Sequence, residues 1–106
     1  MMQEIIEIIE LKQKILNEEI VLLFIKSKNC SVCDAVFVQY GTFLNELRNV
    51  NKYYVSTEKV PSVAGEYLIF TAPTILLFIN GKEVERQSRF VSFEKLSAQI
   101  ERYMEK

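Results

Sequence analysis

The sequence lacks histidine and tryptophan altogether, and it has only two cysteines, two prolines and three glycines among 106 residues. Without histidine no Ser–His or Cys–His pair can form, which excludes enzymes that activate a nucleophile in that way. Two cysteines and no histidine are too few ligands for a tetrahedral zinc site within one chain. An iron–sulfur cluster would need ligands from a second chain or from outside the protein.

A charge excess and a long apolar run are also lacking. Thirteen basic and 14 acidic residues give a net charge of −1, which does not favour nucleic-acid or membrane-surface binding. The longest apolar run, residues 20–25, is too short to span a membrane, and charges interrupt residues 1–19, so we expect no signal peptide. The apolar content of 49% predicts one domain over residues 1–106 with its own core.

The two cysteines, Cys30 and Cys33, form a C-x-x-C motif. An apolar run precedes them, and a helix-period pattern follows at positions 33, 36, 37, 40, 43, 44 and 47. We therefore predict that Cys30 lies in the first turn of a helix over residues 31–49, where backbone N–H groups and the helix dipole lower the pKa of a thiol. This predicts a redox pair in which Cys30 attacks and the more buried Cys33 resolves. The alternative is a pair of inert core thiols.

The rest of the chain alternates strand and helix patterns. The apolar pattern of residues 3–8 predicts a short strand, followed by a helix over residues 9–17, although a single helix over residues 3–18 also fits the pattern. Further strands are predicted at 20–27, 53–57, 75–79 and 83–90, and further helices at 60–69 and after Ser92. Asn80-Gly81 predicts a hairpin between the last two strands. This order predicts an α/β fold with a mixed central sheet flanked by helices on both faces.

C-S-V-C at residues 30–33, Ala72-Pro73-Thr74 before an apolar strand, and Asn80-Gly81-Lys82 resemble the thioredoxin family over nearly the whole chain. The resemblance implies a thioredoxin fold in which a cis Pro73 faces the cysteines. A client in extended conformation would then pair with the backbone of Ala72. The implied substrate-binding residues are Asn29, Ser31, Val32, Ala72 and Pro73.

The sequence departs from the family pattern around the motif. Asn29 stands where thioredoxins usually have Trp, and residues 31–32 replace Gly-Pro. Phe24 replaces a buried aspartate, and the lysine that commonly pairs with this aspartate aligns near Tyr53. Without that carboxylate, Cys33 lacks its usual proton acceptor, so we expect it to resolve slowly near neutral pH.

A glycine usual after the last strand is also replaced, around residues 89–91. If the fold is that of a thioredoxin, Phe90 and Val91 lie near the cysteines. They would form either an apolar docking patch or part of the core.

The sequence thus predicts a cytoplasmic thiol–disulfide oxidoreductase without a bound cofactor, because C-x-x-C in a reducing compartment is more often catalytic or metal-binding than structural. Its partners would be protein disulfide clients and an electron donor, either a reductase or a low-molecular-weight thiol. Three alternatives stay open: a glutaredoxin-like enzyme using glutathione, a thioredoxin-fold binding module with little turnover, and a dimer sharing a metal between two C-x-x-C pairs. The glycine pair of glutaredoxins is absent from residues 87–90.

Overall fold

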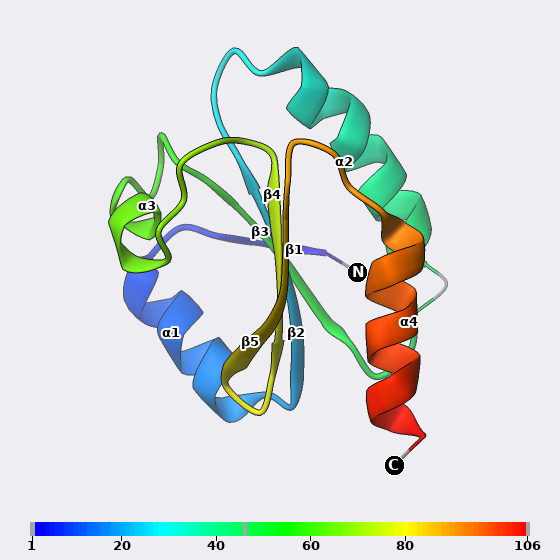
Figure 1. Cartoon of the computed structure of the whole chain (residues 1–106). Coiled ribbons are helices and arrows are strands. Elements are labelled where there is room, and N and C mark those ends of the chain that lie inside the picture. The colour runs from blue at the N-terminus through cyan, green and yellow to red at the C-terminus, as the bar shows by residue number, and fades with distance from the viewer. Residues whose placement is uncertain (1, 46, 106) are drawn as a thin grey trace.

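The computed structural model describes residues 2–45 and 47–105 of the chain (Figure 1). Its five strands form one mixed sheet in the order β1-β3-β2-β4-β5, in which β3 is parallel to β1 and β2, and β4 is antiparallel to β2 and β5. The strands are β1 (Gln3–Ile5), β2 (Ile20–Lys26), β3 (Asn51–Ser56), β4 (Thr74–Ile79) and β5 (Lys82–Ser88). The helices are α1 (Ile8–Asn17), α2 (Ser31–Leu44), α3 (Ser62–Glu66) and α4 (Phe93–Met104).

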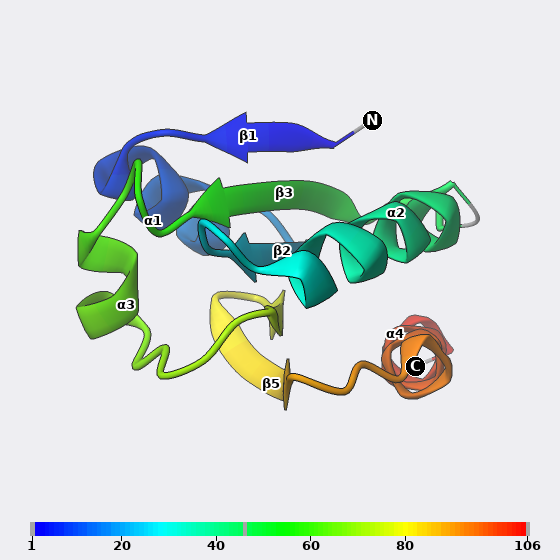
Figure 2. The same ribbon diagram turned by 90° about the horizontal axis from the view of Figure 1, so that it is seen from above.

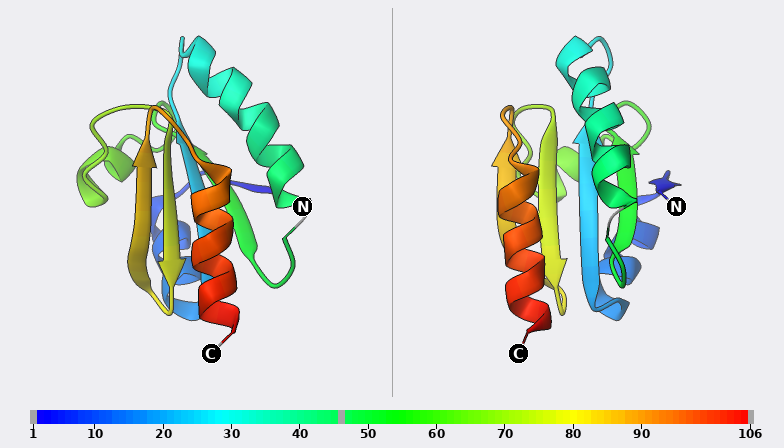
Figure 3. Two further views of the ribbon diagram at one scale, coloured as in Figure 1. Left: turned by 45° about the vertical axis from the view of Figure 1, so that its right-hand side comes forward. Right: turned by 90° about the vertical axis from the view of Figure 1, so that its right-hand side faces the viewer.

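Helices cover both faces of the sheet, as predicted. Figure 2 shows α1 and α3 on one side of the strands and α2 and α4 on the other, and Figure 3 shows α2 and α4 together in front of the sheet. The central strand β2 sends alternate apolar side chains into the two resulting cores, because successive strand residues point to opposite faces. The continuous apolar run of residues 20–25 is therefore buried on both sides, as expected for a central strand.

Three elements end earlier than the sequence pattern predicted, and two of them, α3 and β5, end within two residues of a residue with positive φ. Helix α2 ends at Leu44 rather than at residue 49, and Glu46 of the predicted helix lies outside the described residues. Helix α3 ends before Leu68 at φ 55°, and β5 ends before Arg89 at φ 67°. A left-handed backbone interrupts both helices and strands, so α3 and β5 stop there.

Residues 3–8 adopt the strand-then-helix alternative, with β1 ending at Ile5 and α1 beginning at Ile8. Ser92 caps α4 as predicted, accepting a hydrogen bond from the Lys95 amide at 3.2 Å. None of the helices in the described part of the chain is both long and apolar enough to cross a membrane.

The topology gathers three connections at one end of the sheet. Because β4 is antiparallel to β2 and β5 to β4, the C-terminal ends of β2 and β5 meet the N-terminal end of β4 there. In Figure 1 the start of α2, the connection from α3 to β4 and the connection from β5 to α4 all lie at the upper end of the molecule. The cysteines and Pro73 belong to two of these connections, so segments that are far apart in sequence meet at this end.

Candidate functional site

Cys30 and Cys33 form a disulfide at the start of α2, with their Cα atoms 5.2 Å apart. Cys30 is the N-cap residue, and its Sγ accepts a hydrogen bond from the Cys33 amide at 3.1 Å. Cys33 is 1% exposed, whereas Cys30 is partly exposed. The helix begins at Ser31 as predicted, and the pair therefore presents one accessible and one covered sulfur.

The turn before Cys30 is held by Glu58, in the connection between β3 and α3. The Glu58 carboxylate accepts hydrogen bonds from the Lys28 amide at 2.5 Å, the Ser56 hydroxyl at 2.8 Å and the Thr57 hydroxyl at 3.3 Å. Desolvation acts to raise the pKa of Glu58, but these hydrogen bonds outweigh it and lower the pKa. Sequence reasoning missed Glu58, because its contact with Lys28 spans 30 residues and no local pattern marks it.

Pro73 lies beside the cysteines, as the resemblance implied. The Ala72–Pro73 peptide bond is cis, and the carbonyl oxygen of Ala72 lies 3.9 Å from the Sγ of Cys30. The Pro73 carbonyl accepts a hydrogen bond from the Arg89 amide at 2.9 Å. This bond joins the connection before β4 to the connection after β5, directly beside Cys30.

A cavity of about 440 Å³ opens beside Cys30. It is lined by Asn29, Cys30, Ser31, Val32, Thr71, Ala72, Pro73, Arg89 and Phe90. The structure therefore brings all the predicted substrate-binding residues together around Cys30 and adds Thr71, Arg89 and Phe90. Phe90 is 91% exposed on the cavity wall, whereas Val91 packs against the core between the sheet and helices α2 and α4. The core alternative is thus correct for Val91, whereas a docking role for the exposed Phe90 stays a prediction.

A second cavity, of about 560 Å³, also borders Cys30 and is mostly polar. Its charged residues are two basic and two acidic side chains, Lys26, Lys28, Asp34 and Glu58. The Lys26 ammonium group lies 5.1 Å from the ring centroid of Phe37 and 5.4 Å from that of Tyr54, which is cation–π distance.

Among the described residues, no three His, Cys, Asp or Glu side chains are grouped so as to hold a metal ion.

An aromatic cluster occupies the position of the family's buried aspartate. Phe24 is 0% exposed, and its ring centroid lies 5.3 Å from Phe37 and 5.0 Å from Tyr40. Phe37 follows Cys33 by one helical turn, so it lies on the same side of α2 as the covered sulfur. This cluster contributes no ionisable group that could accept a proton from Cys33 near neutral pH, because burial raises the pKa of the Tyr40 hydroxyl well above its usual value.

The strand register identifies the residue that stands beside Phe24. Phe24 is paired with Tyr54 across β2 and β3, and the ring of Tyr54 lies 5.0 Å from that of Phe37. Tyr53, where the family's lysine was expected to align, points to the opposite face and donates a hydrogen bond to Glu18. In this chain the residue that stands beside Phe24 is therefore Tyr54, the neighbour of Tyr53, and not Tyr53 itself.

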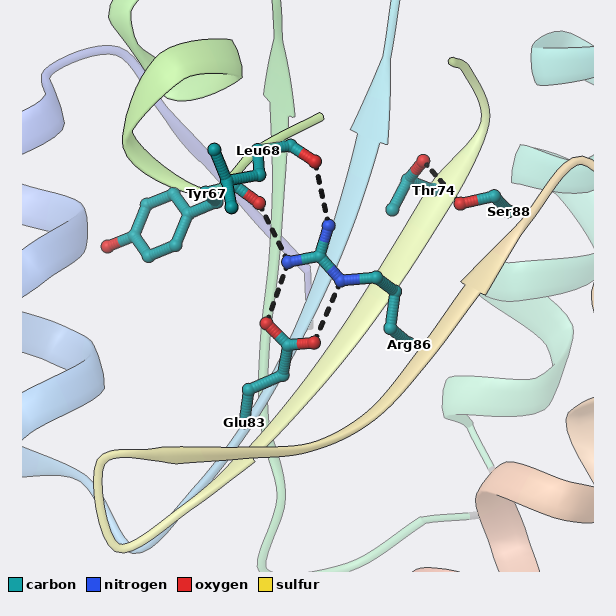
Figure 4. A network of polar contacts seen from close by, with 6 residues as sticks. All are labelled: Tyr67, Leu68, Thr74, Glu83, Arg86 and Ser88. Atoms are coloured by element: carbon teal, nitrogen blue, oxygen red, sulfur yellow. Dashed lines mark hydrogen bonds and ion pairs between the residues drawn. The ribbon is translucent and has the colours of Figure 1, made fainter. Parts of the chain in front are cut away.

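Arg86 of β5 fastens the connection that leads to Ala72 and Pro73, as Figure 4 shows. Its guanidinium donates to the carbonyl oxygens of Leu68 at 2.8 Å and Tyr67 at 2.7 Å, and to both carboxylate oxygens of Glu83 at 2.8 Å. The anchored segment carries two exposed apolar side chains, Leu68 at 61% and Phe70 at 89%. Arg86 therefore anchors the apolar segment that leads to Ala72 and Pro73, a role that the sequence did not reveal.

The Arg86–Glu83 pair makes this anchor sensitive to acid. Hydrogen bonds from Arg86 lower the pKa of Glu83, against the opposing effect of partial burial, and the charge of Arg86 adds to the lowering. A carboxyl whose pKa is lower in the folded state stabilises the fold above its unfolded pKa of about 4.3, and this contribution is lost as the pH falls through the folded pKa. We expect the unfolding free energy of the wild type to be higher than that of Glu83→Gln by about 0.5 kcal/mol at pH 7. Near pH 2 the two proteins should have the same unfolding free energy.

Urea unfolding of both proteins at the two pH values measures this difference. The control is Lys59→Met, which removes a different, exposed ion pair and is compared with wild type in the same way. Lys59 pairs at 3.1 Å with Glu4 of β1, and β1 is the edge strand opposite to β5, which carries Glu83 and Arg86. An equal gap between wild type and Glu83→Gln at both pH values would contradict the assignment.

Comparisons with known proteins agree on one family. A sequence model described as Thioredoxin matches residues 5–102. Thioredoxin-like protein YdfQ of Bacillus subtilis (strain 168) is 38% identical over 80 residues, which cover 76% of this chain and 71% of that protein.

Solved structures agree on the fold. Plasmodium falciparum thioredoxin superimposes with a TM-score of 0.83 at 20% identity, covering 95% of this chain and 98% of that chain. Fasciola hepatica thioredoxin gives a TM-score of 0.82 at 20% identity, covering 94% of this chain and 97% of that chain. Identities this low show likeness of fold alone.

Proposed function

Because the chain belongs to the thioredoxin family, we propose that it is a thiol–disulfide oxidoreductase that reduces or exchanges protein disulfides through Cys30 and Cys33. The observation that carries this proposal is the disulfide at the start of α2, with one sulfur beside an open cavity and the other covered. Disulfide exchange needs an accessible thiolate and a second thiol close by, and this arrangement can supply both.

In the dithiol form Cys30 is the attacking group. Its place at the N-terminus of α2 favours the thiolate, and the Cys33 amide 3.1 Å away can donate a hydrogen bond to it. The thiolate attacks one sulfur of a client disulfide, a new bond forms from Cys30 to the client, and the second client sulfur leaves as a thiolate. The client disulfide is thereby half reduced and held as a mixed disulfide.

Cys33 completes the exchange. Its thiol loses a proton and attacks the Sγ of Cys30, and the remaining client sulfur leaves as a thiolate. The two electrons lost by the Cys30–Cys33 dithiol have then passed to the client, and the protein is left in its disulfide form. A further turnover needs two electrons from a dithiol reductase or from two molecules of a low-molecular-weight thiol.

The cavity beside Cys30 is the proposed client site. The backbone of Ala72 lies next to the sulfur and can pair with an extended client segment, while Asn29, Ser31, Val32 and Pro73 form the walls. Since the exchange needs no bound cofactor, the protein's own dithiol carries the electrons. We propose a cytoplasmic location, since thiols are kept reduced there and a C-x-x-C pair in that compartment can act in catalysis.

The test is the two-electron reduction potential of the Cys30–Cys33 pair together with turnover on a disulfide-linked protein. We expect faster reduction of that substrate by dithiothreitol plus the protein than by dithiothreitol alone. A potential of about −270 mV would indicate a reductase and one of about −120 mV an oxidant, because dithiol proteins with these two roles have reduction potentials of about these values. A folded, fully reduced protein that gives no acceleration would contradict the proposal and favour the binding module, which the aromatic cluster at Phe24 makes the second candidate.

A further inference from the structure

Arg89 carries a positive charge into the cavity beside Cys30 without a partner of opposite charge. No acidic side chain in the described residues forms an ion pair with Arg89, and its Nε makes only a long hydrogen bond, 3.5 Å, to the Thr71 hydroxyl. Arg86, three residues earlier, is by contrast fully engaged by Glu83 and two carbonyl groups. Arg86 therefore serves the fold, whereas the charge of Arg89 remains available to a ligand.

The backbone of Arg89 fixes where this charge stands. Its φ of 67° lies in the left-handed region that glycine adopts most readily, and an arginine there is unusual. The Arg89 amide is bound to the Pro73 carbonyl at 2.9 Å, so the residue cannot move away from Ala72 and Pro73 without breaking that bond. The side chain therefore starts from an anchored point directly beside the proposed client strand.

The two cavities that border Cys30 differ in charge. Of the described residues that line the cavity on the Pro73 side, only Arg89 is charged, and it lies beside the exposed ring of Phe90. The cavity on the other side has equal numbers of acidic and basic residues. A client segment that lies along Ala72 therefore meets a positive potential from one side only, and no carboxylate among those lining residues neutralises this potential.

We propose that Arg89 is a specificity-determining residue that selects disulfides with an acidic residue next to the reacting cysteine. This inference rests on the proposed function and adds the charge of the preferred client. An extended client advances about 3.3 Å per residue, so one or two residues from its cysteine lie within the reach of an arginine side chain anchored beside Pro73. A carboxylate there can form the two-pronged hydrogen bonds that a guanidinium favours.

The experiment uses two disulfide-bonded peptides that differ only in having Asp or Lys next to the attacked cysteine. Each rate with the full-length protein is divided by the rate of the same peptide with dithiothreitol, which removes the peptide's intrinsic reactivity. We expect the wild type to prefer the Asp peptide by about threefold to fivefold in kcat/KM at low salt, as for an exposed ion pair. The ratio of kcat/KM for the Asp peptide to that for the Lys peptide should fall towards one at about 1 M salt, where charges are screened within about 3 Å.

Variants of Arg89 separate charge from shape. Arg89→Lys should keep most of the preference, Arg89→Gly should abolish it while fitting the positive φ, and Arg89→Glu should reverse it in favour of the Lys peptide. Arg102→Glu makes the same charge change in the last turn of α4, outside the lining of the cavity and at the other end of that helix from Arg89, and should leave the preference unchanged. Equal rates for both peptides with the wild type, or an unchanged ratio in Arg89→Glu, would overturn the inference. No turnover of either peptide would overturn the proposed function instead.

Discussion

Cys33→Ser is expected to retain client proteins as mixed disulfides with Cys30, whereas Cys30→Ser is expected to retain few or none. The sequence has only these two cysteines, so removing Cys33 leaves no thiol in the chain that can displace a bound client. Cys33 is covered by protein, and on its own it cannot reach a client disulfide. Turnover of a disulfide substrate should therefore fall to the rate of the reductant alone in either variant, although for opposite reasons.

The measurement is a pull-down from cytosol with each variant, followed by elution with reductant and identification by mass. The double variant Cys30→Ser/Cys33→Ser is the matched control for non-covalent binding. Protein partners eluted by reductant from Cys33→Ser alone would support the exchange mechanism, and glutathione alone would favour the glutaredoxin-like alternative. Partners held equally by all variants and released without reductant would mean that the cavity is a binding site in which the cysteines take no part.

Phe24→Asp is expected to destabilise the fold strongly and, in the folded fraction, to speed release of client from the mixed disulfide. Replacing a buried phenylalanine by a smaller side chain costs about 3–5 kcal/mol, and an unpaired carboxylate in this aromatic cluster adds a desolvation cost. The same carboxylate, however, would stand beside Phe37, one helical turn from Cys33, and we expect it to accept the proton that the resolving thiol must lose. Stability and the resolving step should therefore change in opposite directions.

Phe24→Asn is the matched control, since asparagine has nearly the same shape as aspartate and no ionisable carboxyl. Burial should raise the folded-state pKa of the new carboxyl above its unfolded value of about 3.9. The unfolded state then releases its proton first as the pH rises, so the stability deficit of Phe24→Asp relative to Phe24→Asn should be small near pH 4 and grow towards pH 7. Urea unfolding at several pH values measures this deficit.

Release from the mixed disulfide is best followed in a single turnover at neutral pH, scaled by the folded fraction of each variant. Faster release in Phe24→Asp than in both Phe24→Asn and wild type would support slow proton transfer as the consequence of the natural Phe24. Release that is equal or slower in folded Phe24→Asp would count against it, and a pH-independent deficit between the two variants would show that the carboxyl is not buried.

The sequence by itself determined the features that depend on local pattern. The C-x-x-C spacing places one sulfur at the cap of α2 and the other one turn inside, because helix geometry brings residues three apart to the same side. The unbroken apolar run of residues 20–25 predicted a strand covered on both faces, which is β2. Asn80-Gly81 predicted the hairpin between β4 and β5, with positive φ at both residues.

Only the tertiary structure decided where elements stop and which side chains meet. Asn49, Leu68 and Arg89 adopt positive φ, and of these only Asn is a residue type that favours such a conformation locally, so the ends of α3 and β5 were misplaced. Likewise, Phe24 has Tyr54 rather than Tyr53 beside it because the register of β2 and β3 fixes the pairing.

The side chains that shape the candidate site were also hidden from the sequence. Glu58 reaches Lys28 across 30 residues, Arg86 reaches Leu68 across 18, and the amide of Arg89 meets Pro73 across the end of the sheet. Local periodicity reports how a segment exposes its faces to water, and it carries no information about a partner from a distant segment. Those contacts exist because the sheet brings three chain connections to one end, and there the backbone and the charges of separate segments form a single site.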